Sequence, residues 1–325
     1  MRDPSIDLLR VCLLGYVVAY LHLGGYVGNG ETHVAWWQPA LTTVVLGAFV
    51  FLSGYLLGLW REDSSVSAVL SFYRNRLMRI YPLYLLALAC YVALWITDWQ
   101  TALKAALVLS MFWPEPPATL WFVTMMVVFY CLTPILVVPR ATVSIAVWFV
   151  AWLSMIVLHQ LVQPVDPRVL THFPAFVAGI ACRRFGLRPK LQMHVPVLSL
   201  GTAAALALGV AALHSPDWSA LAAIPSVLLG PALLLAVVDS WLTLLGRLRW
   251  VVWLSYVSFC AYLFHRVVFA ILIRVHWPVD AGSQWALLLL VGLPSVLLLS
   301  YAVQRLYDHA LVWFDDLFAG KNGLR

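Results

Sequence analysis

Residues 39–58 read PALTTVVLGAFVFLSGYLLG, a run of twenty positions without a charged side chain. A helix needs roughly 20 apolar residues to cross the hydrocarbon core of a bilayer. Nine similar runs begin near Ile6, Leu77, Ala118, Thr142, Thr171, His194, Trp218, Trp250 and Gln284. The sequence therefore predicts an all-α, polytopic transmembrane helical bundle with about ten spanning helices.

The composition excludes a soluble protein. Of the 325 residues, 63% are hydrophobic and only 10% are charged, whereas about 25% of the residues in typical globular proteins are charged. The net charge of +6 does not indicate a nucleic-acid partner, because the basic residues lie in short loops between apolar runs, as membrane orientation requires. The five cysteines fall inside apolar runs without metal-ligand or disulfide spacing, so we predict no metal site.

Charge bias predicts the topology. Residues 101–113 form an apolar segment of only 13 residues that ends in a proline-rich turn. If this segment does not span and both termini are cytoplasmic, 16 of the 20 basic residues lie inside, as the positive-inside rule favours. If it spans, the count inside falls to about 9. We therefore expect a short non-spanning helix near 101–113, an uncleaved first span, and a single membrane domain over residues 1–325.

Few ionisable residues lie within the spans, where each costs about 2.5–3.5 kcal/mol at the helix centre. The first span carries Arg10 and His22, and the span near Trp250 carries His265 followed by Arg266. At 1.5 Å per residue, both histidines lie roughly 22–24 Å above the cytoplasmic rim. Each histidine could be an interfacial residue with a satisfied hydrogen bond. Two at one depth, with Arg10 below one of them, also fit a functional pair.

Two further motifs allow both a structural and a functional interpretation. Arg74, Arg76 and Arg79 lie at the cytoplasmic end of the third run, where they satisfy the positive-inside rule or form a clamp for polyphosphate, assisted by helix N-terminal amides. Ser53 and Gly54 are small residues within a bulky run. They favour close packing of two membrane helices, with a narrow ligand passage as the alternative.

Six segments together resemble the integral-membrane acyltransferase 3 family and occur in the family's order. They are residues 6–10 leading to His22, 51–54, 74–82, 120–122 leading to Tyr130 and Pro134, 173–179, and 258–265.

The resemblance implies a bacterial inner-membrane enzyme that transfers an acyl group to a hydroxyl group. The donor would be acetyl-CoA or another acyl-CoA, and the acceptor a carbohydrate or similar molecule. Arg10 and His22 match the first-helix residues thought essential for acyl transfer. The segment 75–79 matches the family's double-arginine donor motif, with Asn75 in place of the first arginine and Arg74 as its substitute. His265 matches a histidine common near the penultimate helix.

The chain departs from the family pattern at two positions. Eleven residues separate Arg10 from His22, whereas the family normally has ten. On a regular helix the extra residue turns His22 by about 100° around the helix axis relative to Arg10. Either a π-bulge restores the family's orientation of His22 relative to Arg10, or this orientation differs from that in the family. Many members also carry a glutamate where this chain has Met126.

From these observations we expect a membrane O-acyltransferase. His22, Arg10 and His265 are the predicted catalytic residues, and Arg74, Arg76, Arg79, Ser53 and Gly54 are the predicted donor-binding residues. Without an appended soluble hydrolase-like domain, transfer is expected to be completed within the membrane domain. A transporter or flippase for an anionic or lipid-linked solute is the alternative, since its arginines would also recognise phosphate, and a membrane sensor or scaffold is a third possibility. The sequence indicates neither the acceptor nor the oligomeric state.

Overall fold

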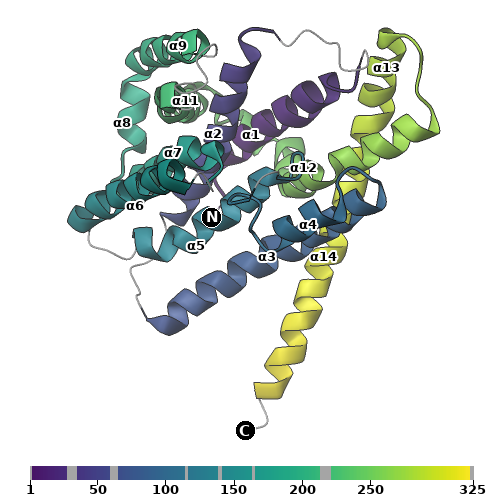
Figure 1. Cartoon of the computed structure of the whole chain (residues 1–325), viewed down its shortest axis with the longest axis horizontal. Helices are drawn as coiled ribbons and strands as arrows, with labels where there is room; N and C mark the ends of the chain where they lie inside the picture. Colours follow the sequence, from purple (N-terminus) through teal and green to yellow (C-terminus); the bar gives the residue numbers. More distant parts are fainter. Residues whose placement is uncertain are drawn as a thin grey trace.

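The computed structural model describes residues 2–27, 35–58, 65–113, 116–137, 141–162, 165–212 and 221–322. Within these ranges the chain is helical and contains no strand. Figure 1 shows the helices packed into one bundle, with α14 projecting beyond the others. The α-helices are α1 (Pro4–Leu14), α2 (Gln38–Leu57), α3 (Val66–Ala93), α4 (Trp99–Ala106), α5 (Trp121–Val137), α6 (Ala141–Val162), α7 (Pro167–Arg184), α8 (Arg188–Met193), α9 (Val195–Ala211), α11 (Ile224–Val237), α12 (Arg249–Val275), α13 (Ala281–Leu287) and α14 (Leu293–Asn322). Three π-helices, η1 (Gly15–His22), η4 (Val238–Leu242) and η6 (Leu288–Gly292), and one 3₁₀-helix, η5 (Leu245–Arg247), complete the set.

The predicted all-α membrane bundle is confirmed. Within the described residues, seven helices are long and apolar enough to cross a membrane, and α5 and α9 are shorter apolar helices of 17 residues each. Helix α7, with 18 residues, corresponds to the run predicted near Thr171. The start predicted near Trp218 lies outside the described residues, and that run is seen from Ile224 onward.

The short helix predicted near 101–113 is α4, which contains eight residues. Eight residues of α-helix extend roughly 12 Å, less than half the hydrocarbon thickness. Its N-terminus is capped by Asp98, whose carboxylate accepts a hydrogen bond from the Thr101 amide at 2.8 Å. Hydrogen bonds from Thr101 lower the pKa of Asp98. The helix packs beside α3, where the Tyr81 hydroxyl donates to the Ala106 carbonyl.

The third span differs from the sequence expectation at its start. The predicted start near Leu77 marks only the apolar part, because α3 begins at Val66 and runs for 28 residues. The Ser65 side chain caps it by accepting from the Ala68 amide. Arg74, Arg76 and Arg79 therefore lie two or more turns into the helix. The proposed help from helix N-terminal amides is wrong, because those amides are not beside the arginines.

Helices α2 and α7 are in backbone contact. A Cβ atom added to Gly54 would overlap the carbonyl oxygen of Phe176, and one added to Gly179 would overlap that of Phe51. Small residues allow membrane helices to approach in this way. The crossing fixes α2 as one wall of the site described next.

The first helix is tied to α12 at both ends. Near its first residues, the Ser255 hydroxyl donates to the buried carboxylate of Asp7 at 2.6 Å. At the other end, the helix changes to the π-helix η1, which contains His22. A π-bulge accommodates one additional residue in a helix. Of the two alternatives for the extra residue between Arg10 and His22, the structure shows the π-helical one.

Candidate active site

A cavity of about 910 Å³ lies between α1, α2, α3, α5, α12 and α14. Its volume falls in the range of roughly 300–1,000 Å³ that is typical of small-molecule and cofactor sites. Six arginines line it, namely Arg2, Arg10, Arg74, Arg76, Arg79 and Arg183. The structure thus brings together the arginines predicted to bind the donor and Arg10 of the predicted catalytic set.

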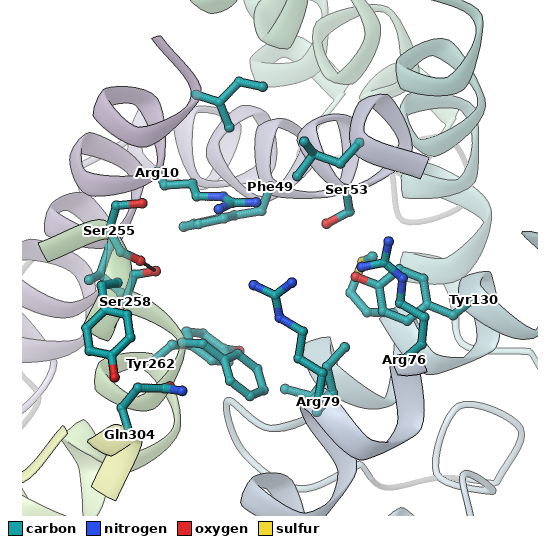
Figure 2. Close-up of a pocket in the computed structure, with 18 of the residues that line it drawn as sticks. Arg10, Phe49, Ser53, Arg76, Arg79, Tyr130, Ser255, Ser258, Tyr262 and Gln304 are labelled. Atoms are coloured by element: carbon teal, nitrogen blue, oxygen red, sulfur yellow. Dashed lines mark hydrogen bonds between the residues drawn. The ribbon is translucent and has the colours of Figure 1, made fainter. Parts of the chain in front are cut away.

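The arginines of α3 differ in their surroundings. The guanidinium of Arg79 points into the middle of the cavity (Figure 2). The guanidinium of Arg76 lies over the rings of Tyr130 and Phe72, with centroid distances of 6.0 and 5.8 Å. Arg76 therefore gains cation–π contacts that hold it at the wall, whereas Arg79 extends toward any molecule in the cavity.

The carboxylates that line the cavity already have partners. Asp3 pairs with Arg188, Asp7 pairs with Arg2 at 3.7 Å and accepts from Ser255, and Asp308 accepts from Tyr256 and Gln304.

Among the residues that the structure describes, no carboxylate lies within ion-pair distance of Arg10, Arg76 or Arg79. Guanidinium groups suit phosphate because they can donate two parallel hydrogen bonds. Arg10, Arg76 and Arg79 can therefore bind an anion without first breaking an ion pair with a described residue.

The two small residues of α2 occupy different environments. Ser53 lines the cavity, and its hydroxyl points inward (Figure 2). Gly54 does not line it, because its α-carbon faces the backbone of α7. The packing interpretation therefore applies to Gly54, and the donor-binding role predicted for it is not supported. Ser53 keeps its place in the predicted site.

The two predicted histidines meet outside this cavity. The rings of His22 and His265 are stacked, with centroids 4.8 Å apart and planes inclined by 4°. The prediction that they share one depth is confirmed. His265 is fully buried, and His22 is partly exposed with its Nδ1 inaccessible. Neither lines the arginine-rich cavity.

Hydrogen bonding fixes the orientation of His265. Its Nδ1 lies 2.7 Å from the Tyr262 carbonyl oxygen. A carbonyl oxygen only accepts hydrogen bonds, so Nδ1 carries the hydrogen, and in the neutral ring Nε2 holds the lone pair. That Nε2 is buried and has no partner. The Nε2 atom of His265 is therefore a hydrogen-bond acceptor to which no described residue donates.

Tyr262 separates the cavity from the histidine pair. Its side chain lines the cavity, and its ring centroid lies 6.1 Å from that of His265. Its hydroxyl donates to the Thr119 carbonyl, in the turn before α5. Figure 2 shows Tyr262 beside Ser258 at the wall that α12 forms. The arginine cluster and the histidines thus lie on opposite sides of one aromatic side chain.

Sequence reasoning missed Arg183 as a site residue, having counted it only as a cytoplasmic charge. It donates to the Tyr55 hydroxyl at 3.0 Å, and its guanidinium lies 5.3 Å from the Tyr55 ring centroid. The Gly54–Gly179 crossing brings this end of α7 against α2. Met126, where many members of the resembled family carry glutamate, is buried and lines the same cavity.

Residues 3–305 match a family model described as an acyltransferase domain. The chain belongs to the acyltransferase 3 family. It is therefore a multi-pass membrane acyltransferase, and the family assignment favours the enzyme over the transporter, flippase and sensor alternatives. Neither the curated proteins nor the solved structures contain a match to the chain.

Proposed function

We propose that this acyltransferase moves an acyl group from cytoplasmic acyl-CoA, with acetyl-CoA as the first case to test, to a hydroxyl group of a carbohydrate or similar acceptor. The observation that carries the proposal is a cavity in which no carboxylate of the described residues lies within ion-pair distance of Arg10, Arg76 or Arg79. Its wall at Tyr262 borders a stacked histidine pair. We place the enzyme in the bacterial inner membrane with both termini in the cytoplasm, in agreement with the charge bias of the sequence.

The arginines are suited to bind the phosphate groups of coenzyme A. Arg79 points into the cavity, and Arg76 is held beside Tyr130. Three of the six lining arginines come from one segment of α3, residues 74–79. A nucleotide bound here leaves the pantetheine arm to run along α2, past Ser53 and Phe49, toward Tyr262.

The histidine pair is suited to remove a proton from the acceptor. His22 would accept the hydroxyl proton while the acceptor oxygen forms a bond to the thioester carbonyl carbon. The C–S bond then breaks, and the coenzyme A thiolate leaves and takes the proton from the imidazolium. His265 stacks on His22 and holds that ring in place. Arg10 lines the arginine-rich cavity and would steady the pantetheine end of the donor.

A series of donors tests the role of the arginines. We compare acetyl-CoA with S-acetylpantetheine, which keeps the thioester and lacks the nucleotide, in wild type and in Arg79→Ala. A charge-assisted hydrogen bond contributes about 1.5–3 kcal/mol, so Arg79→Ala should raise the KM for acetyl-CoA by about 10- to 150-fold. It should change the KM for S-acetylpantetheine by less than about twofold.

Arg249→Ala is the matched control. Arg249 is an exposed arginine at the start of α12 that does not line the cavity, and its removal should leave both donors unaffected. Equal losses of the two donors in Arg79→Ala would contradict phosphate recognition. Absence of any labelled product or acyl-enzyme from labelled acetyl-CoA with wild type would overturn the donor assignment.

A further inference from the structure

Five buried polar atoms near the histidine pair have no hydrogen-bond partner. They are His22 Nδ1, Tyr91 Oη, Thr119 Oγ1, His265 Nε2 and Arg266 Nε. They come from four different parts of the chain, namely η1, α3, the turn before α5, and α12. The mechanism above uses only the histidines, so three of the five have no role in it.

Arg266 connects these groups. Its guanidinium lies 5.9 Å from the ring centroid of Tyr26 and interacts with the Tyr26 hydroxyl. It is also close enough to act electrostatically on Tyr91, His22 and Tyr262. The Thr119 and Tyr91 hydroxyls interact with each other. The five atoms are thus neighbours, whereas the four other unpartnered atoms of the described residues lie on other segments.

The chain positions Thr119 at a conformational cost. Its φ angle is 65°, a left-handed conformation that residues other than glycine rarely adopt, and β-branched residues least of all. The residue is buried, and its carbonyl accepts the hydroxyl hydrogen bond of Tyr262. This conformation places the Thr119 hydroxyl beside Tyr91 while the carbonyl holds Tyr262 at the boundary with the donor cavity.

Unpartnered polar atoms are expensive within a membrane protein. Burying a hydroxyl or amide without a hydrogen bond costs roughly 2–7 kcal/mol. Five such atoms near one another are suited to a molecule that forms hydrogen bonds with them during function. Hydroxyl groups of an acceptor fit, because each can both donate and accept.

The charge of Arg266 narrows the chemistry further. At 1.5 Å per residue it lies roughly 26 Å along α12 from Arg249, toward the outer rim of a hydrocarbon core about 30 Å thick. Within the part of the chain that the structure describes, no carboxylate lies within ion-pair distance of it. A cation whose Nε is buried inside a membrane bundle normally has a partner or marks a substrate path.

We propose that Tyr91, Thr119 and Arg266 form the acceptor-binding subsite beside the histidine pair, and that Arg266 binds an anionic group of the acceptor, a carboxylate or a phosphate. This inference rests on the proposed function, because it takes the histidine pair as the place of acyl transfer. It adds that the acceptor carries a negative charge near the acylated hydroxyl.

The test uses purified full-length enzyme in detergent, saturated with coenzyme A so that the arginine cavity is occupied. Glucose, glucuronate and glucose 1-phosphate are titrated calorimetrically as neutral, carboxylate and phosphate probes. Wild type should bind at least one anionic probe about tenfold or more tightly than glucose. The anionic probe that binds more tightly identifies the charged group of the acceptor as a carboxylate or a phosphate.

Variants assign that preference to named residues. Arg266→Gln should reduce the ratio of the affinity for the preferred anionic probe to the affinity for glucose to near one. Arg266→Lys should keep part of this preference, and Tyr91→Phe should weaken the binding of all three probes. Arg274→Gln is the control, because Arg274 lies on the same helix, is exposed and contacts only the Leu94 carbonyl in the described structure. It should behave as wild type.

Three results would overturn the inference: equal affinity of wild type for the three probes, no binding of any probe, or a preference that survives Arg266→Gln. Acetyl-CoA binding is measured on the same samples without coenzyme A. If wild type does not bind acetyl-CoA, the proposed function itself is rejected. Intact donor binding without the anion preference would reject only the acceptor subsite.

Discussion

Replacing Arg188 with methionine tests how the N-terminal end of α1 is held in place. The Arg188 guanidinium pairs with both Asp3 and Asp239, and its Nη1 donates to the Tyr55 hydroxyl at 3.2 Å. Nε of Arg188 donates to Asp239 at 2.6 Å. Because Asp3 caps α1 and Asp239 lies in η4, one arginine joins the N-terminus of the bundle to two later segments.

The burial of the partners sets the magnitude. The side chains of Arg188 and Asp239 are only 20% and 4% exposed, so removing the arginine leaves a nearly buried carboxylate without a partner. Loss of one member of a buried ion pair costs about 3–5 kcal/mol. We therefore expect Arg188→Met to lower the free energy of unfolding by about that amount. Arg247→Met, which removes an exposed arginine from η5, should have little effect.

The pH dependence provides a second readout. Burial acts to raise the pKa of Asp3, but hydrogen bonds and charge from Arg188, with backbone amides, lower it overall. Hydrogen bonds to Asp239 raise the pKa of Arg188. A carboxyl pKa that is lower in the folded state stabilises the fold above the unfolded value of 3.8, and this contribution disappears as the pH falls through the folded pKa. Thermal unfolding of wild type and of Arg188→Met is measured from pH 7 to pH 3. The difference between their unfolding temperatures should be constant above about pH 5 and should narrow below pH 4. An unchanged unfolding temperature in Arg188→Met, or a gap independent of pH, would refute this account.

Three further predictions follow from the site and the fold. His22→Gln should reduce acyl transfer by about 10²- to 10⁴-fold, as for loss of a general base, while acetyl-CoA still binds and His265→Gln loses only about tenfold; a His22→Gln enzyme with more than about a tenth of wild-type turnover would exclude His22 as the base. A cysteine at position 190, in a background without other cysteines, should react with a membrane-impermeant maleimide only after permeabilisation, and labelling in intact cells would contradict cytoplasmic termini. Gly54→Ala should destabilise the enzyme by about 1–3 kcal/mol, as overpacking does, whereas Gly209→Ala, with open space around the added Cβ, should not; equal thermal stabilities of the two variants would argue against the close crossing of α2 and α7.

Much of the fold could be predicted from the sequence because span length and charge bias are local properties. The short α4 was predicted from the length of its apolar run, and the spacing of one extra residue before His22 allowed a π-bulge as one of two alternatives. The start of α3 could not be predicted in this way, because polarity marks where a helix enters the membrane and not where its hydrogen bonds begin.

The composition of the site depends on contacts between distant segments. The Arg10 and Arg79 side chains face one cavity, and His22 meets His265, only because the helices pack in a particular order. The shared depth of His22 and His265 could be calculated from the sequence, but the stacking of their rings could not. The sequence also did not indicate that Nε of Arg266 has no hydrogen-bond partner, because hydrogen-bond satisfaction is a property of the folded chain.

The π-helical segment Gly15–His22 affects how related enzymes can be detected. A bulge stores one inserted residue in the backbone, and here the His22 ring still reaches its partner on α12. A search pattern that fixes the number of positions between arginine and histidine would treat such a chain as lacking the histidine. An alignment that permits a gap within this helix would retain the histidine.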